Sequence, residues 1–162
     1  MRIGYLTNGT SCEYDMQDRM KQWLSEKELK YIDEFYVPEV QRRPDFLIFK
    51  GSHIINIEAK CNNLDEMLRQ LKDNSKYCDY SFAFIPDYCM TSREFKRFLI
   101  QYGYGLIIYN HDKEIITEVL EAHYNNEIDK NLSRIVIQRM KLELINRKKK
   151  NEISTQEIIN FN

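Results

Sequence analysis

The segment 45–60 constrains the fold more than any other part of the sequence. Two runs rich in apolar and branched residues, 45–50 and 53–60, lie on either side of Gly51-Ser52. Such runs, separated by two residues that include a glycine, are typical of a β-hairpin. We therefore expect an antiparallel pair of strands here, and the register of that pair decides which polar side chains meet.

Asp45, Glu58 and Lys60 are the polar residues that this hairpin would bring together. Asp45 is six residues before Gly51, and Glu58 is six residues after Ser52. In a regular two-residue hairpin, Asp45 and Glu58 face each other across the ladder. Lys60 projects from the same face as Glu58, because side chains alternate along a strand.

Two adjacent carboxylates are typical ligands of a hard cation such as Mg²⁺, which keeps several waters and accepts phosphate oxygens. Such an ion polarises a phosphate and lowers the pKa of a bound water, and Lys60 would orient that water or stabilise the developing charge. The carbonyl of Ala59 is a further candidate ligand. The alternative is a surface ion pair between Glu58 and Lys60, with Asp45 merely starting a strand.

The rest of the pattern places this hairpin within a larger α/β fold. An amphipathic helix over residues 12–30 and a strand over 31–37 precede it. A helix capped by Asn63 and Glu66, a strand over 80–85, a helix after Thr91, strands over 105–109 and 114–120, and a charged helix from Glu127 follow it. This order predicts a mixed central sheet flanked by helices. We divide the chain into a domain of residues 1–125 and a basic C-terminal helix with a frayed tail over 126–162.

The composition favours one globular domain. Hydrophobic residues make up 43% of the 162 residues, which excludes a mainly disordered chain. The net charge of -1 conceals a basic end, with eight Lys or Arg against five Asp or Glu from residue 126 onward. An acidic core with a basic end fits a metal site with a phosphate-contacting arm, and it equally fits a solvated helix. Because no long apolar segment is present, we expect a cytoplasmic protein without membrane association.

The cysteines are scattered, and we expect free thiols. Cys12, Cys61, Cys78 and Cys89 form no CxxC pair, and the histidines are equally dispersed. Free thiols are therefore favoured over a zinc or iron-sulfur site.

Arg43-Pro44-Asp45, followed by Glu58-Ala59-Lys60, resembles the PD-(D/E)xK, or restriction-endonuclease-like, superfamily. The element order over residues 12–110 is similar to the αβββαβ core of that fold, here with an extra C-terminal helix. The residues before Asp45 and those at 77–80 are similar to small stand-alone repair nucleases of the MmcB-like kind. The resemblance implies a Mg²⁺- or Mn²⁺-dependent deoxyribonuclease in which Asp45 and Glu58 bind metal and Lys60 is catalytic. DNA is the implied partner, and many relatives are homodimers.

The resemblance also suggests supporting residues. Many relatives add an acidic residue from the first helix or strand; Glu34 is our choice, with Glu13 and Glu26 as alternatives. RecB-like relatives carry a Gln and a Tyr four residues apart on the helix after the lysine, whereas Gln70 and Tyr77 are seven apart; Gln70 is kept as a candidate. The cysteine spacing departs from the iron-sulfur pattern of that branch, so no cluster is expected.

Basic residues near the motif would contact the DNA backbone without reading its sequence. These are Arg42, Arg43, Arg69, Lys72 and Lys76, with residues 147–150 as an outer arm or a solvated tail. Two other functions remain open: a catalytically silent nuclease-fold protein that binds nucleic acid or protein, and an unrelated α/β interaction protein in which the trio is coincidental.

Overall fold

The computed structural model describes residues 9–89 and 92–160, with side chains from Cys12 to Cys89 and from Ser92 to Glu152. Its elements are α1 (Gly9–Glu26), β1 (Lys30–Asp33), β2 (Phe46–Lys50), β3 (His53–Ala59), α2 (Leu64–Asn74), β4 (Tyr80–Pro86), the 3-10 helix η1 (Asp87–Cys89), α3 (Arg93–Tyr102), β5 (Gly105–Asn110), β6 (Ile115–Leu120) and α4 (Lys130–Asn160). Within the described residues the strands form one sheet in the order β1-β2-β3-β4-β5-β6.

The sheet is mixed, as the sequence predicted. Strand β3 is parallel to β4, and β4 is parallel to β5, with α2 and α3 making the two crossovers. The other neighbouring pairs are antiparallel. The predicted α/β class, with helices flanking a mixed sheet and an extra C-terminal helix, is therefore confirmed.

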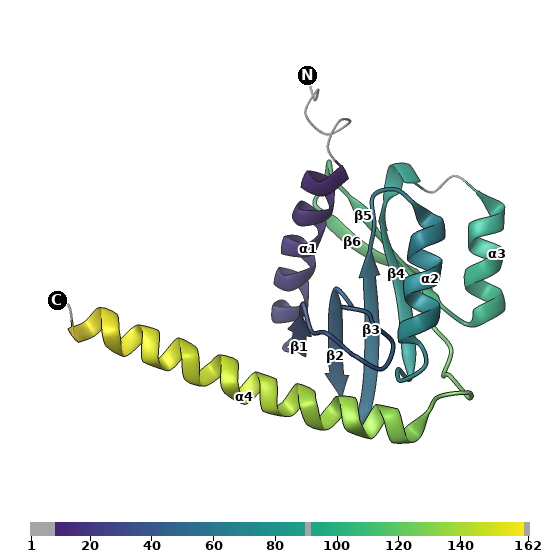
Figure 1. The fold of residues 1–162 in the computed structure, drawn as a ribbon. Helices are drawn as coiled ribbons and strands as arrows, with labels where there is room; N and C mark the ends of the chain where they lie inside the picture. The colour runs from purple at the N-terminus through teal and green to yellow at the C-terminus, as the bar shows by residue number, and fades with distance from the viewer. Residues whose placement is uncertain (1–8, 90–91, 161–162) are drawn as a thin grey trace.

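Helices cover both faces of the sheet (Figure 1). On one face, Met16, Met20 and Leu24 of α1 pack against alternate residues of β2, β3 and β5. On the opposite face, α2 and α3 cover the other residues of β4 and β5. Each fully buried aliphatic side chain contributes about 1.5–3 kcal/mol relative to exposure. The two layers therefore hold the sheet rigid on both sides of the β2–β3 hairpin.

The local signals in the sequence account for most element ends. Gly51 adopts φ +64° in the turn, and Lys50 pairs with His53, which makes the predicted two-residue hairpin. Asn63 caps α2 by accepting a hydrogen bond from the Glu66 N–H at 3.3 Å. The cap of α3 is Ser92, next to the expected Thr91, which lies outside the described residues.

Strand β1 is shorter than the predicted strand over residues 31–37. It ends at Asp33 because Glu34 adopts φ +52°, in the left-handed region, which breaks the extended backbone. Val37 then makes only an isolated bridge to Arg42.

The C-terminal helix belongs partly to the core. Val136 and Met140 of α4 are fully buried against Ile32, Leu47 and Ile54 of the sheet. The C-terminal part of the helix extends away from the body, as Figure 1 shows, and it continues to Asn160 through residues predicted to fray. None of the described helices is both long and apolar enough to cross a membrane.

Candidate functional site

The hairpin register places Asp45 opposite Glu58. Phe46 pairs with Ile57, so Asp45, one residue before β2, continues the register to Glu58 near the end of β3. Both Asp45 oxygens are held: Oδ2 accepts the Ala59 N–H at 2.8 Å, and Oδ1 accepts the Gln17 amide at 3.2 Å. The facing carboxylates predicted by counting from the turn are therefore present.

Burial strongly affects both carboxyl groups. Burial raises the pKa of Glu58 well above its usual range, and the negative charge of the neighbouring Asp45 raises this pKa further. Burial also raises the pKa of Asp45, against the opposing effects of the Ala59 hydrogen bond and the positive charge of Lys60. The side chain of Glu58 is nearly inaccessible, at 1% exposure. The pair therefore favours the protonated form of Glu58, and a bound cation would instead compensate two ionised carboxylates.

The acidic candidates from the N-terminal segments occupy different places. Glu13, on α1, lies close enough to Asp45 for its charge to raise the pKa of Asp45, and its Oε1 accepts the Cys61 N–H at 3.4 Å. Glu34 is exposed on the loop after β1. Glu26 is exposed near the end of α1 and pairs with Arg19 at 3.6 Å. Of the three, Glu13 and Glu34 line the same cleft as Asp45, and Glu26 does not.

A cleft of about 210 Å³ opens beside Asp45. Its walls come from α1, the end of β1 and the segment leading into β2. The lining residues are Glu13, Tyr14, Gln17, Lys21, Asp33, Glu34, Arg43, Pro44, Asp45 and Phe46. Asp45 therefore borders open space, whereas Glu58 lies behind it.

Asn74 contacts the site although the sequence did not single it out. It is the last residue of α2, it is buried, and its Nδ2 donates to Glu58 Oε1 at 2.6 Å. The hydroxyl of Tyr77 donates to Asn74 Oδ1 at 2.9 Å. Gln70, one turn earlier on α2, has a buried Oε1 without a hydrogen-bond partner in the structure. A sequence signal existed: Asn74 continues the apolar stripe of Met67 and Leu71.

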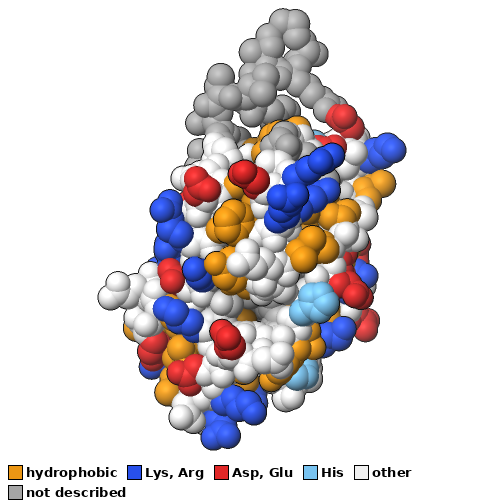
Figure 2. Space-filling view, turned by 90° about the vertical axis from the view of Figure 1, so that its right-hand side faces the viewer, with side chains coloured by type: hydrophobic (Ala, Val, Ile, Leu, Met, Phe, Trp, Pro, Cys, Tyr) orange, Lys and Arg blue, Asp and Glu red, His pale blue; other side chains and the backbone are white. Residues whose placement is uncertain are grey.

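The residues predicted to contact DNA differ in how far their side chains are engaged by other residues of the chain. Arg42 is held by Asp73 at 2.9 Å and by Glu66 at 2.8 Å, so it ties its loop to α2. Arg69 pairs with Glu66, Lys76 lies 3.9 Å from Asp73, and Lys72 lies over the ring of Tyr102. Arg43 is exposed and lines the cleft. On the face that Figure 2 views, lysine and arginine side chains are interspersed with acidic ones.

Arg147, the first residue of the predicted outer arm, is hydrogen-bonded to Asp33. Arg147 donates to the carboxylate and to the carbonyl of Asp33, both at 2.9 Å, and this fastens α4 to β1. Residues 148–150 are exposed.

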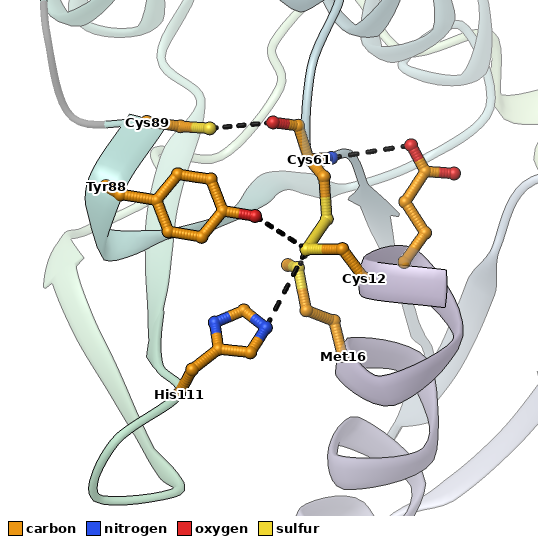
Figure 3. The surroundings of a disulfide bond; sticks show 7 residues. Cys12, Met16, Cys61, Tyr88, Cys89 and His111 are labelled. Carbon is orange, nitrogen blue, oxygen red and sulfur yellow. Dashed lines mark hydrogen bonds between the residues drawn. A yellow bond between two sulfur atoms is a disulfide. The ribbon is translucent and has the colours of Figure 1, made fainter. Parts of the chain in front are cut away.

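Two of the cysteines are not free thiols, and that expectation was wrong for them. Cys12 of α1 and Cys61, just after Lys60, form a disulfide. Figure 3 shows Tyr88 and His111 around it, with the Tyr88 hydroxyl 2.8 Å from Cys12 Sγ. The thiol of Cys89 donates to the Cys61 carbonyl at 2.7 Å. Spacing did not reveal this bond, because the α1–β3 contact that forms it is tertiary.

The donor set suits a hard cation that keeps part of its hydration. Among the residues that the structure describes, no three His, Cys, Asp or Glu side chains form a metal-binding group. Mg²⁺ sites commonly use only one or two carboxylates, with waters and substrate phosphates completing the coordination. The Asp45–Glu58 pair, with Glu58 buried and Asp45 bordering the cleft, provides two such carboxyl groups.

Comparison with known proteins agrees with a nuclease-like fold. A family model described as "Competence protein CoiA, nuclease-like domain" matches residues 16–85, a span that contains Asp45, Glu58 and Lys60. No curated protein matches the chain. Together with the observed architecture, the family match supports a nuclease-like core.

Solved structures resemble the chain in fold at low sequence identity. A protein of unknown function from Silicibacter pomeroyi is 19% identical, with a TM-score of 0.60 over 83% of this chain and 88% of that one. An XisH family protein from Nostoc punctiforme is 13% identical, with a TM-score of 0.49 over 68% and 98%. Pyrococcus furiosus SfsA, in complex with Ca²⁺, is 15% identical, with a TM-score of 0.39 over 70% and 64%. The first of these similarities supports the α/β fold.

Proposed function

We propose that this chain is a metal-dependent DNA phosphodiester hydrolase. The observation that carries the proposal is the facing pair of Asp45 and Glu58 at the end of the β2–β3 hairpin, where Asp45 lines the cleft and accepts the Ala59 N–H at 2.8 Å. The match to a nuclease-like domain supports the same reaction class.

In this proposal, Asp45 and Glu58 hold Mg²⁺ or Mn²⁺, and the carbonyl of Ala59 is a further ligand. The bound metal would supply Lewis acidity toward a phosphate and a more acidic water. Lys60 donates a hydrogen bond to the attacking water or to a phosphate oxygen on which negative charge increases. Glu13 replaces Glu34 as our preferred additional acidic residue, because its charge acts on Asp45.

The substrate would approach through the cleft beside Asp45. Arg43 is exposed on its wall and is suited to a phosphate contact. Arg42, in contrast, is engaged by Asp73 and Glu66, so it supports the loop that carries Arg43.

Cleavage of plasmid and linear DNA with Mg²⁺ or Mn²⁺ tests this function. We expect the native chain to cleave with metal and not with EDTA, and Lys60→Ala to cut at least about 100-fold more slowly, as for loss of one donor to the transition state. Lys50→Ala is the matched control, since Lys50 is an exposed lysine at the other end of the same hairpin. Equal rates for the native chain and Lys60→Ala would contradict the proposed role of Lys60.

A second candidate is a catalytically silent nuclease fold that binds nucleic acid or protein. The observation that favours it is that no group of three metal-ligating side chains is found among the described residues. Titration with Mn²⁺ separates the two, because a silent module need not bind the ion at Asp45 and Glu58.

A further inference from the structure

We propose that Asn74 is a positioning residue for Glu58, and that Tyr77 fixes the orientation of Asn74. This inference rests on the proposed metal-dependent function; it adds Asn74, which the sequence motif does not include, and gives Tyr77 a part in orienting it. Neither residue would touch the substrate; both act through the carboxyl group of Glu58.

Three side chains form a continuous buried chain of hydrogen bonds. The Tyr77 hydroxyl donates to Asn74 Oδ1 at 2.9 Å, and Asn74 Nδ2 donates to Glu58 Oε1 at 2.6 Å. The exposed fractions are 0% for Tyr77 and 1% for both Asn74 and Glu58. The chain connects the turn before β4, the last residue of α2 and the end of β3, so three separate elements fix one carboxyl group.

The direction of these hydrogen bonds gives each residue a distinct part. Because the Tyr77 hydroxyl occupies Asn74 Oδ1, the amide presents its N–H group to Glu58. An N–H donor favours a carboxylate oxygen, and it stops rotation of the carboxyl group about its last bond. Glu58 is thereby held in one orientation beside Asp45, which faces it at the end of the β2–β3 hairpin.

Packing alone would not require an amide at position 74. Met67, Leu71 and Asn74 form the buried side of α2, and an apolar residue would continue that side without the cost of burying an amide. Asn56 offers a contrast on the same strand as Glu58. It is fully buried, yet neither of its amide atoms has a hydrogen-bond partner in the structure. Asn56 therefore shows that an asparagine can be buried near Glu58 without the hydrogen bond to it that Asn74 forms.

Removal of a group that orients a metal ligand typically lowers metal affinity by about 10- to 100-fold. The test is a Mn²⁺ titration of the metal-stripped full chain, in which electron paramagnetic resonance measures free Mn²⁺. The variants are Asn74→Ala and Tyr77→Phe, and Asn56→Ala is the matched control. We expect Asn74→Ala to weaken binding about 10- to 100-fold and Tyr77→Phe about fivefold, the effect of losing one neutral hydrogen bond. Asn56→Ala should bind like the native chain.

A second measurement separates positioning from general stability. In DNA cleavage, Asn74→Ala should raise the Mg²⁺ concentration needed for half-maximal rate, with a smaller effect on the rate at saturating Mg²⁺. Circular dichroism establishes that each variant is folded; if Asn74→Ala is not, Tyr77→Phe decides the question. If Asn74→Ala is folded and binds Mn²⁺ with native affinity, the inference is overturned. If Asn74→Ala is not folded, native Mn²⁺ affinity in Tyr77→Phe overturns it instead. Absence of Mn²⁺ binding by the native chain would instead overturn the proposed function on which it rests.

Discussion

Asp45 and Glu58 face each other at the open end of the β2–β3 hairpin, where Asp45 Oδ2 accepts the N–H of Ala59, the residue after Glu58, at 2.8 Å. Two neighbouring carboxyl groups cannot both ionise without repulsion, and burial of Glu58 removes the water that would weaken it. The pair therefore favours a proton on Glu58 when no cation is bound, and a bound cation would take the place of that proton. We therefore expect this pair to affect protonation, stability and ligand binding.

Glu58 should make the metal-free protein less stable as the pH rises. Its pKa is raised in the folded state, so the folded protein holds this proton at pH values where the unfolded chain has lost it. Stability linked to Glu58 is fully present below the unfolded pKa of about 4.3 and is lost as the pH rises toward the folded value. Glu58→Gln, which cannot ionise, should therefore be more stable than the native chain at pH 7.5. Urea unfolding in EDTA at pH 5 and 7.5 measures this, and parallel changes in the two proteins would argue against it.

The disulfide should contribute substantially to stability. Cys12 and Cys61 are separated by 49 residues, and closing a loop of that length stabilises the folded state by about 4 kcal/mol in the chain-entropy model. The variant Cys12→Ser/Cys61→Ser should unfold at a lower urea concentration, and dithiothreitol should then have no further effect. Cys89→Ser, which alters a cysteine outside the disulfide in the same region, serves as the control. Equal midpoints for the native and double-serine proteins would show that the bond does not stabilise the fold.

The neighbouring arginines Arg42 and Arg43 should have separable roles. Arg42→Ala removes the hydrogen bonds to Asp73 and Glu66 and should cost about 1 kcal/mol of stability, because all three side chains are partly exposed. Arg43→Ala should leave stability unchanged, weaken DNA binding and lower the salt dependence of binding by about one unit of slope. Urea unfolding and salt-dependent binding of labelled DNA in EDTA measure these effects. An unchanged salt slope for Arg43→Ala would remove Arg43 from the DNA contact.

The hairpin could be predicted from the sequence because its determinants are local. A two-residue turn with Gly51 at φ +64° fixes the register, and the register fixes the partner of Asp45. Helix α2 was predictable for the same reason, since its cap and its apolar periodicity lie within one segment. These features depend on neighbours in sequence.

The remaining features of the site depend on contacts between distant segments. The pairing of Cys12 with Cys61 and the approach of Glu13 to Asp45 both follow from how α1 crosses the sheet. Helical periodicity gives the buried side of α1 but not its position along the strands, so Glu34 was preferred to Glu13. Asn74 was detectable as a polar residue on an apolar stripe, but its partner Glu58 was not.

Titration of the metal-stripped chain with Mn²⁺, followed by isothermal calorimetry, is the most direct test of a metal site at Asp45 and Glu58. We predict saturable binding by the native chain and its loss in both Asp45→Asn and Glu58→Gln. Glu118→Gln, which changes an exposed acidic residue on β6, should bind like the native chain. Saturable binding that survives in Asp45→Asn and Glu58→Gln, or no binding by the native chain, would contradict a metal site at this pair.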